Sequence, residues 1–317
     1  LLQNFGDQKL KIEFSVPKLL FGNNFEELEE SDFWAVVDAL DQRLQLYSIS
    51  IDRYDLAEAN VTGFHLGKNI LFEDYTSASS MISLFWRADY SKRLDMMHTQ
   101  YENWWTLFRL HSNSFQIVLY DKIADLKKSS KRAVEKNDRE HNLQMQFFDE
   151  IRTVQQRPVE IVRLEIRFLA KQRMRSIFLE LWLLDKFSLR AIFKKDVWQK
   201  LILKYWDILS LWLWPVLLSD LTNVEQYEHI CRCDVGPKDA LMCLGYLSLL
   251  KDETRKVLDI VEKNKQLRSW YRNKASVIQS ISKQKIRNLP LQNMDRQMRE
   301  LKSLRKTDID YNSVIYW

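Results

Sequence analysis

The hydrophobic period of the chain changes once, near Lys171, and this change constrains the fold more than any other feature. Before it, short runs such as residues 115–120 alternate apolar and polar side chains, or are rich in β-branched and aromatic residues, as strands are. After it, apolar residues recur at helical spacing almost to the end. The sequence therefore predicts an α+β protein: an antiparallel-sheet domain with packed helices over residues 1–170, then a mainly helical region over residues 171–317.

The expected elements follow from these patterns. A helix beginning at Phe33 is expected after a cap at Ser31 and Asp32, and residues 123–140 are highly charged and predict a helix or a mobile excursion. Strands are expected at residues 9–16, 46–57, 79–87, 106–110, 115–120 and 159–168, with weak strands or loops at 64–72. Helices are expected at residues 171–186, 188–193, 196–219, 237–249, 251–283 and 291–305.

Composition narrows the class of protein. Six Gly and five Pro among 317 residues are too few for an all-β sandwich with many tight turns. The longest uncharged apolar run, residues 208–219, is shorter than the ~20 residues that a membrane span needs, so no transmembrane helix is expected. Residues 251–317 hold 16 Lys or Arg against 8 Asp or Glu, which favours a polyanionic partner or a solvated helical face.

The cysteines, the N-terminal residues and the absence of two common motifs indicate the cellular compartment and exclude some activities. Cys231, Cys233 and Cys243 lack a second ligand pair, so reduced cytoplasmic thiols are expected, with a zinc site involving His229 as the alternative. The N-terminus has neither an initiator Met nor a signal pattern, which suggests a fragment. No phosphate-binding Gly-rich loop and no Gly-x-Ser-x-Gly elbow is present, so ATP hydrolysis and serine esterase chemistry have no support.

Acidic residues within the expected strands are candidates for chemistry. Glu13, Asp55 and Glu165 each interrupt an apolar series, with Asp52 as a fourth candidate. Buried acids must be paired or metal-bound, so these residues indicate either a Mg²⁺ or Mn²⁺ site or salt bridges. Arg53, Arg163 and Arg167 are available as ion-pair partners, and the residues alone do not decide between the two interpretations.

Tyr120 ends the most strand-like run of the sequence and is a candidate nucleophile. A phenol has an ordinary pKa of ~10, so a nucleophilic tyrosine needs a nearby cation, metal ion or base. Lys122, two residues later, would lie on the same face of an extended strand and could supply the cation. The alternative interpretation is an aromatic side chain with a purely structural role at a strand end.

The order and spacing of four blocks resemble the replication-initiation-factor family, which comprises initiators of rolling-circle plasmids and phages and related conjugative relaxases. The likeness covers roughly residues 9–170, more loosely the helical remainder. Its blocks are Lys-Ile-Glu-Phe-Ser-Val-Pro-Lys at 11–18, Arg-Tyr-Asp-Leu-Ala at 53–57, a strand ending in Tyr-Asp-Lys at 111–122, and Val-Arg-Leu-Glu-Ile-Arg-Phe at 162–168.

The resemblance implies a DNA strand-nicking and joining enzyme that forms a 5′-phosphotyrosine. It implies Tyr120 as nucleophile, assisted by Lys122, and Asp55 and Glu165, with Glu13 a weaker candidate, as ligands of Mg²⁺ or Mn²⁺. Single-stranded DNA or an extruded origin hairpin would be the substrate, with the basic residues 127–132 and 251–287 holding phosphates; a homodimer and a helicase partner are further expectations. Two departures are Ala59, where the family often has a second acid, and Ala124 with Asp125, where it usually has a Glu.

Two other functions remain open at this point. The first is a non-catalytic DNA-binding protein of the same fold, which would bind DNA without nicking it. The second is a helical protein-interaction module built on the Trp-rich residues 171–219, which would have a protein partner and no affinity for DNA.

Overall fold

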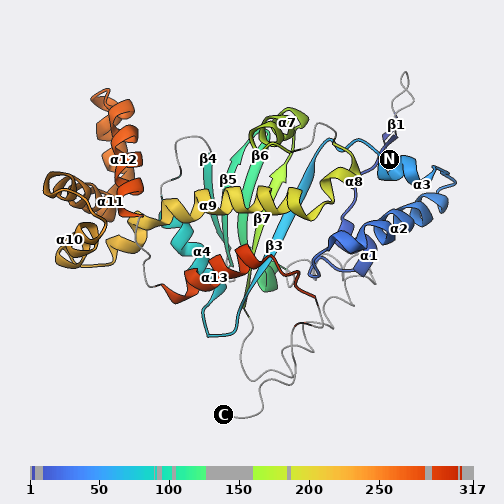
Figure 1. Ribbon diagram of the computed structural model, residues 1–317, viewed down its shortest axis with the longest axis horizontal. Helices are drawn as coiled ribbons and strands as arrows, with labels where there is room; N and C mark the ends of the chain where they lie inside the picture. The colour runs from blue at the N-terminus through green and yellow to red at the C-terminus, as the bar shows by residue number, and fades with distance from the viewer. Residues whose placement is uncertain are drawn as a thin grey trace, which may run out of the picture.

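A computed structural model describes residues 2–3, 10–88, 90, 95–101, 105–125, 160–183, 187–282, 288–305 and 308. Its centre is a five-stranded antiparallel sheet in the order β3-β7-β6-β5-β4 (Figure 1). The strands are β3 (Phe64–Phe72), β4 (Asp95–Tyr101), β5 (Trp105–Ser112), β6 (Phe115–Asp121) and β7 (Glu160–Phe168). Two further strands of two residues each, β1 (Leu2–Gln3) and β2 (Leu10–Lys11), pair with each other outside this sheet. The predicted α+β class with an antiparallel sheet is confirmed.

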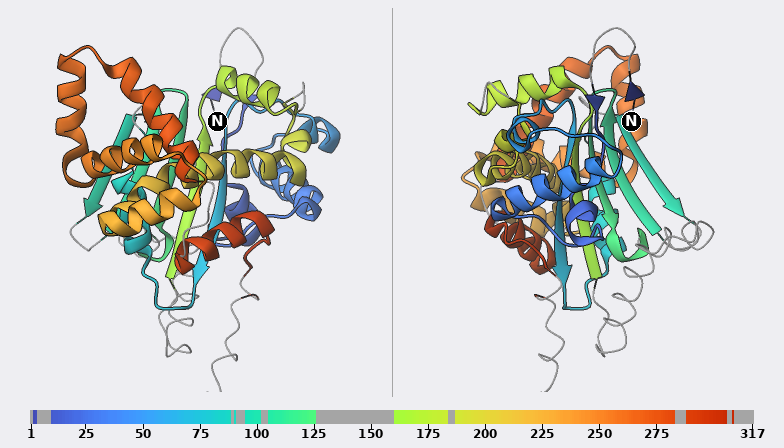
Figure 2. Two further views of the ribbon diagram at one scale, coloured as in Figure 1. Left: turned by 60° about the vertical axis from the view of Figure 1, so that its left-hand side comes forward. Right: turned by 90° about the vertical axis from the view of Figure 1, so that its right-hand side faces the viewer.

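One face of the sheet is covered by helices (Figure 2). Helix α9 (Lys195–Ser219) crosses this face, and α4 (Ala78–Arg87), α7 (Lys171–Glu180) and α13 (Leu289–Glu300) contact its strands or α9. The main core joins the inward residues of the strands to those of α9, with Trp206 fully buried at the centre. Because residues on both sides of position 170 share this core, the switch from strands to helices there does not separate two cores.

Two helical units extend the molecule beyond opposite ends of the sheet (Figure 1). One contains α10 (Asn223–Arg232), α11 (Pro237–Lys263) and α12 (Leu267–Ile281), and its own apolar cluster includes Leu218 from the end of α9. The other contains α1 (Val16–Phe21), α2 (Phe33–Gln45) and α3 (Arg53–Ala57), with α8 (Leu189–Ile192) beside α3.

Several predicted elements are confirmed and others are wrong. The predicted strands at 106–110, 115–120 and 159–168 are found as β5, β6 and β7, and the predicted helix at Phe33 is α2. The predicted strand at 79–87 is helix α4, because Ala78, Met81, Ile82 and Phe85 bury one helical face. Thr222 and Glu225 form a capping box that begins α10, a helix that the periodicity did not predict.

The two N-terminal strand predictions are also wrong. Only Leu10–Lys11 of the segment 9–16 is in a strand, and Pro17 lies in the first turn of α1 rather than ending a strand. The segment 46–57 turns at Ser48, whose φ is 57°, and then forms α3, whose N-terminus is capped by the Asp52 carboxylate. Most of the charged segment 123–140, including the basic residues 127–132, lies outside the described residues.

Helix α9 has the length and apolar composition that would suffice to cross a membrane. Its buried residues form part of the main core against the sheet, so packing accounts for this composition.

The outer edge of β3 is closed by side chains. The Gln297 side chain of α13 accepts a hydrogen bond from the Leu71 amide at 2.9 Å and donates one to the Leu71 carbonyl at 2.8 Å. The Glu27 carboxylate accepts from the Asn69 amide and, at 2.9 Å, from the amide of Leu304. These contacts satisfy backbone groups that an edge strand otherwise leaves unpaired.

Candidate functional site

The face of the sheet that points away from the helices carries a row of charged residues on β7, which lies between β3 and β6. Arg163, Glu165 and Arg167 are partly exposed and alternate with the buried Val162, Leu164 and Ile166. In the sheet register, Arg163 pairs with Tyr120 on β6 and with Asn69 on β3. The strand alternation therefore brings the phenol, the guanidinium and the amide onto one face.

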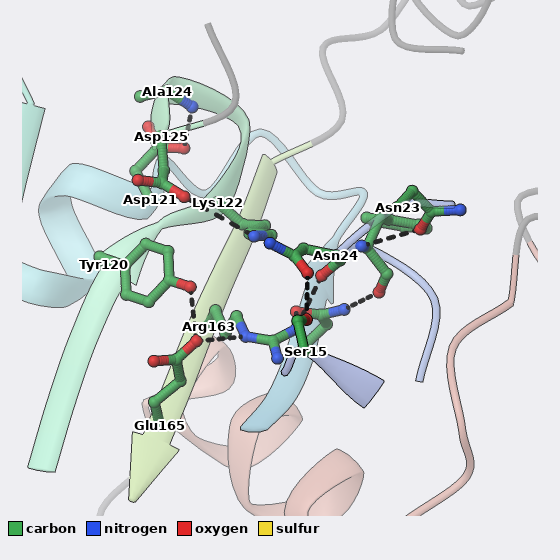
Figure 3. A network of polar contacts seen from close by, with 12 residues as sticks. Ser15, Asn23, Asn24, Tyr120, Asp121, Lys122, Ala124, Asp125, Arg163 and Glu165 are labelled. Carbon is green, nitrogen blue, oxygen red and sulfur yellow. Dashed lines mark hydrogen bonds and ion pairs between the residues drawn. The ribbon is translucent and has the colours of Figure 1, made fainter. Parts of the chain in front are cut away.

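Glu165 is the centre of a hydrogen-bond network (Figure 3). Its Oε1 accepts a hydrogen bond from the Tyr120 hydroxyl at 2.7 Å and one from Arg163 Nε at 2.9 Å. Its Oε2 accepts two from Arg167, at 2.9 Å from Nε and 2.6 Å from Nη2. Burial opposes the charge of Glu165, but Arg163 and Arg167 outweigh it and lower the pKa of this carboxyl group to about 2. The carboxylate is therefore ionised and fully engaged.

Tyr120 lies almost buried at the end of β6, with 9% of its surface exposed. Burial raises the pKa of its phenol well above the ordinary value, and the charge of Arg163 acts in the opposite direction. The hydroxyl is consequently protonated in the resting protein and donates its proton toward Glu165.

Lys122 lies beside Tyr120, as predicted, but it does not share an extended strand with Tyr120. Strand β6 ends at Asp121, and Lys122 begins a helical turn instead of continuing the strand. Its ammonium nitrogen still lies 5.6 Å from the centre of the Tyr120 ring and 3.6 Å from Asp125 Oδ2. Burial and the charge of Arg163 lower the pKa of Lys122 to about 8. A basic amine thus accompanies the candidate nucleophile.

The three predicted metal ligands do not assemble into one site. Glu165 lies on β7 as expected, but Glu13 is an exposed loop residue paired with Lys11, and Asp55 is exposed in the first turn of α3, which packs against α2 and α8. Asp52, the fourth candidate, caps α3.

The described residues around Tyr120 do not fit a divalent cation. In the part of the chain that the structure describes, no three or more His, Cys, Asp or Glu side chains form a group that could hold a metal ion. Both oxygens of Glu165 already accept hydrogen bonds from cationic or hydroxyl donors, so a cation there would face two guanidinium groups. For Glu165, the salt-bridge interpretation is the one that the geometry supports.

The cysteines, His229 and Arg53 lie outside the network around Glu165. Cys231, Cys233 and Cys243 form no disulfide bond, Cys231 is exposed, and His229 Nε2 lies 3.3 Å from the Ile281 carbonyl. Arg53, the other predicted ion-pair partner, binds Asp38 at 2.7 Å instead of a strand acid.

Sequence reasoning missed two members of the site, Asn69 and Asn24. Asn69 Oδ1 and the Asn24 carbonyl accept hydrogen bonds from Arg163 Nη1 at 3.1 and 3.3 Å. The available signal was Asn69 within the apolar end of β3, because a buried amide requires partners.

Comparison of the chain with models of protein families, with curated proteins and with solved structures gives no match in any of the three.

Proposed function

We propose that the protein is a DNA strand-nicking and strand-joining enzyme in which Tyr120 is the nucleophile. The observation that carries the proposal is the position of the Tyr120 hydroxyl, which is oriented by Glu165 at 2.7 Å and lies beside Arg163 and Lys122. A tyrosine that attacks a phosphodiester needs positive charge near the phosphate and a base for its proton. The cluster contains candidates for both.

The reaction is a transesterification. The Tyr120 oxygen attacks phosphorus and forms a phosphotyrosine bond, while the bond from phosphorus to the 3′ oxygen breaks and the 3′ oxygen leaves as a hydroxyl after taking up a proton from the solvent. The phenol proton passes to Lys122 in its neutral form, which its pKa of about 8 makes accessible near neutral pH. The reverse reaction rejoins the strand without ATP, because the phosphotyrosine conserves the bond.

A cationic surface away from Tyr120 supports a nucleic acid as the partner. Lys263, Lys265, Arg268 and Arg272 are exposed around the connection of α11 to α12. This hairpin projects from the body of the protein (Figure 1). Such clusters attract the phosphate backbone without reading sequence.

A second candidate function is non-catalytic DNA binding by the same fold. The observation in its favour is that Tyr120 is almost buried and that Glu165 holds its hydroxyl in a saturated network. In that case the hydroxyl has a structural role, and DNA binding proceeds without cleavage.

The test compares two tyrosine variants for covalent attachment of single-stranded oligonucleotides, detected on a denaturing gel. Tyr120→Phe should abolish the protein–DNA adduct and leave DNA affinity unchanged. Tyr90→Phe is the matched control, because Tyr90 is equally buried and donates its hydroxyl to the Leu209 carbonyl at 3.1 Å on the opposite face. An adduct that persists in Tyr120→Phe contradicts the assignment, and DNA binding by the wild type without any adduct favours the second candidate.

A further inference from the structure

The guanidinium group of Arg163 is held in a fixed position beside Tyr120. Its Nε donates to Glu165 and its Nη1 to Asn69 and the Asn24 carbonyl, at 2.9 to 3.3 Å. Only 11% of the side chain is exposed. Among the described residues, the acceptors of this guanidinium are reached through Nε and Nη1, and Nη2 lies over Gly67.

Gly67 provides the space for this guanidinium. The Arg163 side chain lies across Gly67 on the neighbouring strand, where a Cβ atom would be 2.7 Å from its Cζ and 2.8 Å from its Nε, and nearer still to Nη2. At these distances, any other residue at position 67 would force the Arg163 guanidinium to move. The sheet is therefore shaped to hold a cation at this point.

Three cations lie near Tyr120 together with two carboxylates. Lys122, Arg163 and Arg167 lie beside Glu165, whose two oxygens are both occupied, and Asp125 pairs with Lys122 at 3.6 Å. A phosphodiester brings the negative charge that such a cluster lacks, and a planar guanidinium binds phosphate oxygens with directional, charge-assisted hydrogen bonds. A divalent cation would bring more positive charge, and the carboxylates of Glu165 and Asp125 already have cationic partners.

We propose that Arg163 and Lys122, and not a divalent metal ion, bind the phosphodiester group beside Tyr120. This inference deepens the proposed function and rests on it for the identity of the ligand. In the displacement at phosphorus, charge develops on the non-bridging oxygens. Arg163 stabilises it as a fixed cation, and Lys122 adds to this once it has taken the phenol proton.

The first experiment measures binding of trithymidylate to the full chain by fluorescence anisotropy, in EDTA and in Mn²⁺. The affinity in EDTA should equal that in Mn²⁺ within roughly twofold, and Arg163→Met should lower it roughly 10- to 100-fold in both buffers, the loss expected for a charged hydrogen bond to phosphate. Lys122→Met is the second variant, because it removes a buried charge and should fold even if Arg163→Met does not. Arg87→Met, whose guanidinium binds Asp220, is the control without effect.

Two results would overturn the inference. One is binding that requires Mn²⁺ and is lost in Glu165→Gln; the other is binding that neither Arg163→Met nor Lys122→Met weakens. The adduct assay with Tyr120→Phe is separate from this measurement. Metal-independent binding without an adduct would thus refute nicking and retain the phosphate site.

Discussion

The Tyr120 hydroxyl meets Glu165 diagonally across two strands, since the sheet register pairs Tyr120 with Arg163 and Glu165 with Val118. Val118 has no polar side-chain atom, so the Glu165 carboxylate takes its hydrogen bonds from Tyr120, Arg163 and Arg167. One carboxylate therefore orients the phenol and also anchors two arginines. The predictions below separate these roles.

Glu165 should make stability depend on acid pH. The ordinary pKa of a glutamate side chain is 4.5, and that of Glu165 in the folded protein is about 2. The ionised carboxylate therefore adds to the free energy of unfolding above pH 4.5, and this addition is lost as pH falls toward 2. The full contribution is on the order of 3 kcal/mol. Urea unfolding of wild type and Glu165→Gln across this range should give curves that converge at low pH. Glu58→Gln, which breaks a more exposed pair with Arg190, should show a much smaller effect.

Lys122→Met should stabilise the protein at pH 7. The folded pKa of about 8 lies below the ordinary 10.5, so the charged amine opposes folding at neutral pH, and wild-type stability rises as pH increases from 8 toward 10.5. The gain in Lys122→Met is expected to be on the order of 1 to 3 kcal/mol at pH 7 and to shrink at pH 10. Urea unfolding at the two pH values checks it, and an equal difference at both would contradict the assigned pKa. The same substitution should abolish the rise of adduct formation through pH 8.

Gly67→Ala should displace Arg163, because the new methyl group occupies the position of the guanidinium. A loss of about 1 to 3 kcal/mol in stability is expected for this overpacking. In the background of Arg163→Met, the same change at Gly67 should cost much less, which a double-mutant cycle measures. Gly245→Ala in α11 meets nothing within 4 Å and should instead raise stability by up to about 1 kcal/mol.

Gln297→Ala should expose the edge of β3. Two hydrogen bonds to Leu71 are lost, and the cost should be about 1 to 3 kcal/mol. Light scattering should show faster aggregation on heating, because the amide of Leu71 is left free to pair with another chain. Gln292→Ala, at another position of α13, is the comparison; equal aggregation of the two variants would contradict the role of Gln297.

Replacing Lys265, Arg268 and Arg272 by Ala should weaken DNA binding in a salt-dependent way. If each contacts a phosphate, the slope of log affinity against log salt for single strands should fall by about 2. Arg175→Ala on α7 serves as the control for an exposed charge elsewhere. An unchanged slope would remove the hairpin from the DNA-binding surface.

The sequence predicted β6 and β7, because their patterns are complete within a few residues, but it indicated only weak strands or loops where β3 lies. In β7 the charged Arg163, Glu165 and Arg167 alternate with apolar neighbours, and β6 is bounded by polar residues and ends at Asp121. The segment 79–87 was misassigned as extended because a short apolar run fits a buried strand or a helix equally well. Asp55 was placed in a strand because local composition does not reveal the turn at Ser48.

The internal arrangement of the site could not be predicted, because it depends on pairing between distant strands. The position of Arg163 over Gly67 follows from the register of β3 with β7, and the Asn24 carbonyl arrives from a loop before α2. The sequence offered both metal ligation and ion pairing for Glu165. The choice between these two roles depends on which side chains the strand register places beside Glu165.

The junction at the β3 edge has a consequence for the order in which the protein can fold. Glu27 and Leu304 exchange hydrogen bonds with each other, Arg305 binds Asp32 at 2.6 Å, and Gln297 completes the same edge. Synthesis on the ribosome delivers residues 297–305 long after β3 has emerged, so this edge stays open until late in translation. Contacts between such distant positions form slowly. During that period the unpaired backbone groups of the β3 edge are open to pairing with another chain.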